Sequence, residues 1–143
     1  MAASRVFVAV LAASLAEVED RVSLPQFRVL VMADAEEPLT LSAVAEGLAI
    51  HPSNATRTVD RLVEAGLLDR RDNPADRRQV QLTLTAQGRQ LKDEVYDHRR
   101  TAIGVVLRKM SAQDRHLLAT SMATFAETAH TLGVDRAPAI TWL

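Results

Sequence analysis

Cysteine is absent from this 143-residue chain, and aromatic residues make up only 3% of it. The lack of cysteine excludes disulfides, thiolate metal sites and cysteine-based redox sensing, and it fits a cytoplasmic location. Alanine, valine and leucine therefore carry most of the 48% hydrophobic content. That composition favours a helical protein over a β-sandwich. No apolar run reaches the ~20 residues that a membrane span requires.

An excess of charge is also lacking, because the formal net charge is −1. This balance argues against a non-specific, purely electrostatic binder of nucleic acid. The charges are unevenly distributed, however. Residues 1–50 hold three basic and seven acidic residues, whereas residues 51–143 hold 14 basic and 11 acidic ones. The second part of the chain is therefore compatible with a protein that directs a few arginines towards DNA.

The first segment has two interpretations. Residues 6–16 are apolar, follow Arg5 and end in small residues, which is typical of a secretory signal peptide. We favour a helix over residues 3 to about 21, because apolar residues recur at steps of three and four beyond any cleavage point. The polar face of this helix is narrow, so we expect protein to cover both of its sides.

The middle of the chain predicts a helix-turn-helix. Ser23-Leu24-Pro25-Gln26 forms a capping-box pattern that begins a helix ending near residue 35. Thr40 is a suitable N-cap for a helix over residues 41–48, and a three-residue turn leads to Pro52 at the start of another helix over residues 52–65. Gly66 then serves as its C-terminal cap. A short helix, a tight turn and a second capped helix match the helix-turn-helix pattern.

The second of these helices has one apolar and one polar face. Ala55, Val59 and Leu62 recur at helical spacing and are expected to be buried. The N-terminal turns of a recognition helix reach base edges, where asparagine can bind adenine and arginine can bind guanine. An ordinary solvated face is the alternative, since Asp60 and Glu64 lie there too. The candidate DNA-reading residues are Ser53, Asn54, Thr56, Arg57 and Arg61.

Residues 67–85 predict a β-hairpin with a charged tip, because two flanks with strand character enclose a polar centre. A hairpin directly after a helix-turn-helix is a wing. Arginine suits a narrow minor groove, and an aspartate can orient a neighbouring guanidinium. A solubilising charged loop is the alternative. The candidate wing residues are Arg70, Arg71, Asp76, Arg77 and Arg78.

Two long helices are expected after the hairpin. Thr85 caps the first, over residues 86 to about 110, and the capping pattern that starts at Ser111 begins the second. Apolar residues of the second helix recur at alternating steps of four and three, which indicates a packing seam. The candidate dimer-interface residues are Phe7 and Leu11 of the first helix with Leu118, Met122 and Phe125 of the last.

Several of these segments together resemble a known family. Residues 41–46 and 52–62 resemble the helix-turn-helix of MarR regulators, and residues 66–70, 76–78 and 82–88 resemble that family's wing and its exit into a long helix. The Asp76-Arg77-Arg78 sequence with Leu84-Thr85-x-x-Gly88 at this spacing is the most specific part. The resemblance covers about residues 20 to 130.

The resemblance implies a mostly α-helical fold with a small β-hairpin, in which the chain is a single MarR-like domain. Residues 24–85 would form the winged helix-turn-helix, residues 1–22 and 86–132 the dimerisation helices, and residues 133–143 a tail. The implied function is a sequence-specific regulator of transcription, and repression is the commoner outcome. A homodimer would place its recognition helices in the major groove of double-stranded DNA and a wing arginine in the minor groove. Two-fold symmetry predicts an operator that is an inverted repeat.

The resemblance also implies a small aromatic or phenolic effector, bound between the dimerisation and DNA-binding regions, although the sequence does not indicate the pocket residues. A constitutive regulator without an effector is the alternative. The family's peroxide-sensing branch relies on cysteine, which is absent. Its zinc-sensing branch is disfavoured because His51, His98, His116 and His130 form no close helical pair. We therefore predict no metal site and no cofactor.

Two other classes of protein fit less well. An enzyme is disfavoured because the sequence has no glycine-rich phosphate loop, metal triad or nucleophile with a suitable base. Ser53 lies near His51, but both residues are at a helix start, where capping accounts for them. A pure dimerisation or interaction module would explain the helical seams but would leave the wing arginines without a role.

Overall fold

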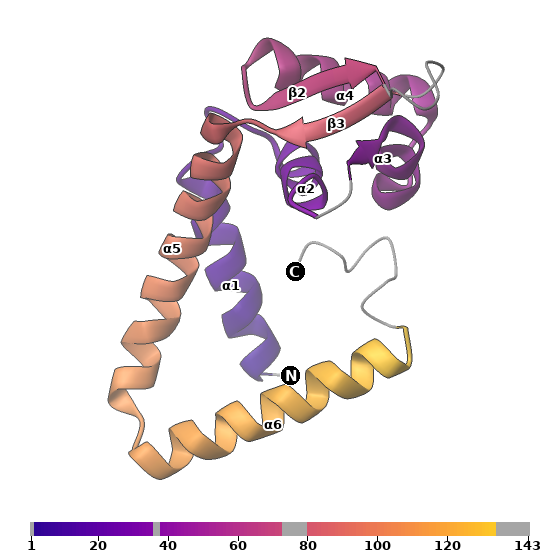
Figure 1. The fold of residues 1–143 in the computed structure, drawn as a ribbon. Coiled ribbons are helices and arrows are strands. Elements are labelled where there is room, and N and C mark those ends of the chain that lie inside the picture. Colours follow the sequence, from indigo (N-terminus) through magenta and orange to yellow (C-terminus); the bar gives the residue numbers. More distant parts are fainter. Residues whose placement is uncertain (1, 36–37, 73–79, 134–143) are drawn as a thin grey trace.

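A computed structural model of the chain describes residues 2–35, 38–72 and 80–133. The elements form a winged-helix region, a pair of helices leading away from it, and a final helical arm (Figure 1). In chain order they are α1 (Ala2–Ala16), α2 (Leu24–Met32), β1 (Leu39–Thr40), α3 (Leu41–Leu48), α4 (Pro52–Glu64), β2 (Leu68–Asp72), β3 (Val80–Leu84), α5 (Ala86–Lys109) and α6 (Ala112–Thr131).

The strands form a small antiparallel sheet in the order β1-β3-β2. Strands β2 and β3 are the predicted hairpin, with Leu68 opposite Leu84 and Arg70 opposite Leu82. Strand β1 was not predicted, and it pairs Leu39 with Leu82 on the other edge of β3. The sheet thereby ties the wing to the segment that precedes α3.

The hydrophobic core lies in the winged-helix region. Phe27 and Leu30 of α2, Leu62 of α4 and Leu82 of β3 are fully or almost fully buried, and they belong to one cluster that α5 also enters. The predicted inward face of α4 is confirmed, since Ala55, Val59 and Leu62 are all buried. Each buried side chain of this size contributes roughly 1.5–3 kcal/mol to folding.

Most predicted helix boundaries are confirmed, including the caps at Thr40, Thr85 and Ser111. Helix α1 is shorter than predicted, because it ends at Ala16 and residues 17–21 form turns. Acidic residues at positions 17, 19 and 20 follow its last turn. Negative charge there is repelled by the negative C-terminal end of the helix dipole and disfavours a longer helix. The turns also direct Val18 and Val22 into the core. Helix α2 ends at Met32, three residues before the predicted end.

Gly88 determines how closely α5 approaches the start of the wing. A Cβ atom at this position would lie 2.1 Å from the carbonyl oxygen of Leu67, so only glycine fits without a shift of the backbone. The N-cap Thr85 reinforces the junction, since its hydroxyl donates to the carbonyl of Gly66 at 2.7 Å and accepts from the amide of Gly88 at 3.0 Å. The junction therefore fixes the direction in which α5 leaves the winged helix.

Candidate nucleic-acid interface

Helix α4 begins with a histidine cap. His51 has extended backbone angles, Pro52 occupies the first helical position, and His51 Nδ1 accepts a hydrogen bond from the Ser53 amide at 3.3 Å. An amide N–H can only donate, so the neutral ring carries its proton on Nε2. The Ser53 hydroxyl lies 2.9 Å from the same Nδ1. The one serine–histidine pair that resembled a catalytic pair is thus a helix cap.

The polar face of α4 carries the predicted DNA-reading residues. Asn54, Arg57 and Arg61 recur at steps of three and four, so they share one face, and all three are exposed. Within the residues that the structure describes, no hydrogen bond or ion pair engages their side chains. These three exposed polar side chains are therefore available to bind another molecule.

Ser53 and Thr56 are less available than the sequence suggested. Ser53 is exposed but faces His51, as described above. Thr56 is half-buried, and its hydroxyl donates to the carbonyl of Pro52 at 3.1 Å. Both hydroxyl oxygens can still accept a hydrogen bond, so these two residues retain a smaller capacity for contact than Asn54 or Arg57.

The end of α4 sets the position of the wing. Gly66 adopts a φ of 71°, in the left-handed region that favours glycine. Its amide donates to the carbonyl of Val63 at 2.9 Å, and the Leu67 amide donates to that of Leu62 at 2.9 Å. This pair of hydrogen bonds is the Schellman ending of a helix. It turns the chain directly into β2, so the predicted wing follows α4 without a flexible connection.

Arg70 links strand β2 to helix α4. Its Nη1 donates to Asp60 Oδ1 of α4 at 2.9 Å, across a partly exposed surface. The sequence placed Asp60 among the residues of a solvated face and did not indicate this pairing. Arg71, by contrast, remains largely exposed, with Asp69 at 3.4 Å. The other predicted wing residues, Asp76, Arg77 and Arg78, lie outside the described residues.

A second ionic cluster joins the winged helix to α5. Asp34, just after α2, accepts hydrogen bonds from Arg89 Nη1 at 2.7 Å and from Lys92 Nζ. Burial alone lowers the pKa of Lys92, but the hydrogen bonds and charges of Asp34 and Asp93 outweigh it, so the pKa is raised from its ordinary value. The Lys92 ammonium also lies 5.6 Å from the centre of the Tyr96 ring. The sequence did not indicate this cluster, because Asp34 lies more than 50 positions from both Arg89 and Lys92.

The predicted dimer-interface residues lie on surfaces that this single chain leaves uncovered. Phe7, Met122 and Phe125 are exposed to 41%, 42% and 69%, and Leu11 and Leu118 are half-buried. Helix α6 has no buried residue along its length and projects as an arm from the far end of α5 (Figure 1). The apolar seam of α6 is therefore present but has no apolar partner in the described part of the chain.

Two kinds of feature are missing from the described residues. No helix among them combines the length and apolarity that crossing a bilayer requires. They also contain no group of three or more histidine, cysteine, aspartate or glutamate residues placed to hold a metal ion.

Known proteins share this arrangement. The family model of the MarR family matches residues 22–80 of the chain. This match extends from α2 to the start of β3. The organic hydroperoxide resistance transcriptional regulator of Bacillus subtilis is 30% identical over 109 residues, covering 76% of this chain and 73% of that protein. The chain belongs to the MarR family. It is a DNA-binding regulator of transcription with a winged-helix fold.

Solved structures of MarR-type proteins agree in fold. The structure of RV1404 from Mycobacterium tuberculosis has a TM-score of 0.78 and 40% sequence identity, and the match covers 88% of this chain and 86% of that one. FabT of Streptococcus pneumoniae, solved in complex with DNA, has a TM-score of 0.69 at 18% identity over 90% and 93% of the two chains. At 18% identity, the match to FabT supports the fold alone.

Proposed function

We propose that this MarR-family regulator is a homodimeric repressor that binds an inverted-repeat operator and is released from it by a small molecule. The proposed DNA contact is supported by the polar face of α4. Asn54, Arg57 and Arg61 are exposed there, and their side chains have no partner within the described residues. Each recognition helix would enter the major groove, with half-sites one DNA turn apart, ~34–36 Å, or a multiple of it.

The wing would act differently from the helix. Arg71, with its guanidinium largely exposed, and the predicted Arg77 and Arg78 would contact the minor groove and phosphates. We assign Arg70 to holding the wing against α4, because its guanidinium already pairs with Asp60. Asp76 would orient a neighbouring arginine, as the sequence predicts.

The test begins with selection of bound sequences from random duplex DNA. Affinity for the selected operator and for scrambled DNA is then measured at several salt concentrations. We expect Arg57→Ala to weaken operator binding by about 1–3 kcal/mol for each bidentate base interaction that it removes. It should also relax specificity at one base pair of each half-site. Arg71→Ala should weaken binding to both DNAs and flatten the salt dependence by ~0.9 in slope for each phosphate that is no longer neutralised.

Arg100→Ala is the matched control, because this exposed arginine of α5 lies outside the winged helix and pairs only with Asp97 in the described part of the chain. If Arg57→Ala behaves like Arg100→Ala on the operator, α4 does not read the bases. Full affinity for a single asymmetric half-site would contradict the two-fold arrangement.

Release by an effector is tested separately. The resemblance to MarR regulators suggests a small aromatic or phenolic ligand. Candidate ligands are added to the operator complex, and the remaining bound fraction is measured. A constitutive regulator would keep its operator affinity with every ligand tested.

A further inference from the structure

A hollow lies between helices α3 and α4, beside the polar face of α4. Its volume is about 610 Å3, and most of its lining residues are aliphatic. Leu41 and Ile50 are half-buried and pack against the hydrophobic core as well as lining this α3–α4 hollow. Ala45 of α3 and Pro52 of α4 add further apolar surface. The walls are therefore anchored in the core, and the proposed arginine contacts with DNA leave this apolar recess without a role.

The hollow is continuous with the proposed DNA-reading surface. Pro52 and Thr56 line it, and they lie one turn apart at the start of α4. The N-terminal turns of a recognition helix are the part that reaches base edges. Asn54 and Arg57, the proposed base readers, lie on the same two turns. A helix that enters the major groove with these two side chains would bring the hollow to the edge of a neighbouring base pair.

Thr56 presents a methyl group to the hollow. A threonine side chain branches at Cβ into one hydroxyl and one methyl. The Thr56 hydroxyl donates to the carbonyl of Pro52 at 3.1 Å, so it is turned back onto the helix. That hydrogen bond selects between the two rotamers that threonine adopts in helices. The methyl is the remaining branch, and it is held in place before any ligand binds.

The charge beside the hollow determines what can enter it. Glu46 of α3 is exposed and lines the hollow, whereas no basic residue of the described chain does so. A carboxylate repels a DNA phosphate. Among the groups that base pairs present in the major groove, the C5 methyl of thymine is the apolar one. An aliphatic hollow beside a carboxylate therefore suits a thymine methyl and not the phosphate backbone.

We propose that the α3–α4 hollow reads one thymine in each half-site of the operator, by receiving its C5 methyl against Ile50, Pro52 and Thr56. This inference rests on the proposed function and deepens it, because it adds an apolar specificity contact to the polar contacts of Asn54 and Arg57. Cytosine has no methyl at this position, so the contact favours thymine over cytosine.

The experiment measures affinity for the selected operator after each dT is replaced in turn by dU, at symmetric positions of both half-sites. The replacement removes the methyl and keeps every hydrogen-bonding group of the base. Burial of one methyl group changes affinity about 4-fold, so we expect one symmetric replacement to weaken binding about 15-fold. An operator without an invariant thymine, or unchanged affinity after every replacement, would overturn the proposal.

Variants locate the contact. Thr56→Ser removes the methyl but keeps the hydroxyl that binds Pro52, so it should reduce the dU penalty from about 15-fold to about 4-fold or less. Thr56→Val keeps a methyl and the shape of threonine, so it should retain the penalty. Thr58→Ser is the matched control. Thr58 is also half-buried on α4 and its hydroxyl bonds to the carbonyl of Asn54 at 2.9 Å, but it does not line the hollow.

The outcomes separate this inference from the proposed function. Equal dU penalties in Thr56→Ser and Thr58→Ser would overturn the assignment to the hollow. Arg57→Ala should lower operator affinity and still retain the dU penalty. If Arg57→Ala weakens binding but no thymine methyl matters, the hollow does not read DNA and the reading role of α4 stands. If neither change matters, α4 does not read the bases and both proposals fail.

Discussion

Phe125→Ala is the substitution that best tests whether α6 forms a dimer. Phe125 is 69% exposed in the single chain, on a helix without any buried residue. Full burial of a phenylalanine side chain contributes roughly 1.5–3 kcal/mol, so covering the exposed two thirds would contribute about 1–2 kcal/mol. A two-fold dimer contains two copies, and their removal should cost about 2–4 kcal/mol of association. The dimer dissociation constant should therefore rise about 30- to 700-fold.

Sedimentation velocity over a series of protein concentrations measures that constant. Thr120→Ala is the matched control, because Thr120 is exposed on the opposite side of α6 and its hydroxyl bonds only to the carbonyl of His116 within the described chain. Phe125→Asp should dissociate the dimer more completely, since it would place an unpaired charge in an apolar seam. A monodisperse monomer for the unaltered chain, or equal constants for Phe125→Ala and Thr120→Ala, would refute the reasoning.

Three further substitutions probe the framework of the winged helix. Asp34→Asn should lower the free energy of unfolding by about 2 kcal/mol, between the values for exposed and buried ion pairs, because Lys92 is mostly buried. The pKa of Lys92 is raised in the folded chain, so this stabilisation should be fully present below the ordinary lysine pKa of ~10.4. It should be lost as the pH rises through the raised pKa. Unfolding by urea at neutral and at strongly alkaline pH measures the difference. Gly88→Ala should destabilise the chain by about 1–3 kcal/mol, because its Cβ would meet the carbonyl before β2; an unchanged urea midpoint would contradict that packing. Arg70→Ala should change stability by less than about 1 kcal/mol, because its ion pair with Asp60 is partly exposed, yet it should weaken operator binding by loosening the wing; unchanged operator affinity would exclude a positioning role.

The parts of the fold that were predictable from the sequence are those that local signals determine. Helix α4 carries its own cap, its own proline at the first turn and a buried face at helical spacing, and each is found where expected. The hairpin likewise follows from the alternation in residues 79–84. Local signals do not extend to β1, because a strand of two residues exists only through pairing with β3.

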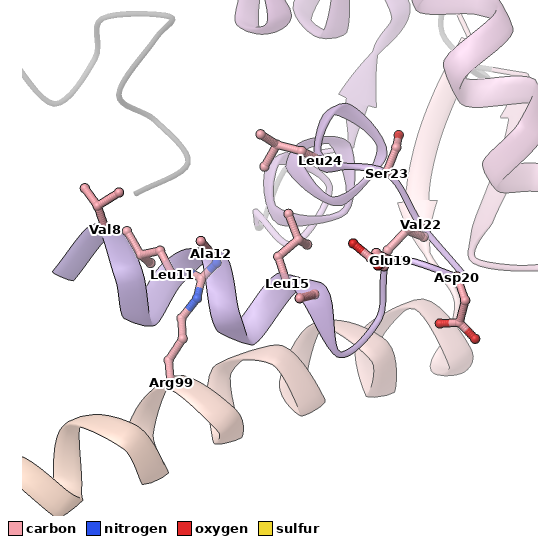
Figure 2. Close-up of a pocket in the computed structure, with 11 residues that line it drawn as sticks. Val8, Leu11, Ala12, Leu15, Glu19, Asp20, Val22, Ser23, Leu24 and Arg99 are labelled. Carbon is pink, nitrogen blue, oxygen red and sulfur yellow. The ribbon is translucent and has the colours of Figure 1, made fainter. Parts of the chain in front are cut away.

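The residues that hold the site together were not predictable for the same reason. From the sequence, Asp60 and Arg70 were expected to be separate surface charges. Their ion pair forms because the Schellman ending of α4 directs β2 back beside that helix. Arg99 and Arg100 are adjacent in the sequence, yet one is buried against Ser14 and the other is exposed beside Asp97. Arg99 follows the buried Leu91 and Val95 at steps of four and so lies on the inward face of α5, towards α1 (Figure 2). That spacing does not indicate that Ser14 of α1 is the residue it contacts.

Helix α5 physically connects the winged helix to α1, which leads to a quantitative prediction for the proposed ligand response. Lys92, early in α5, binds Asp34 of the winged-helix region, and Arg99, two turns later, binds Ser14 of α1. A ligand shifts operator binding only if it has different affinities for the DNA-binding and the released arrangement. If an effector found by the release assay weakens operator affinity by some factor, operator DNA must weaken the affinity for that effector by the same factor. Titration of the effector into the free protein and into the operator complex measures the second factor, and competition on the operator measures the first. We expect the two factors to agree. Unequal factors would mean that the effector also acts at a second place on the protein.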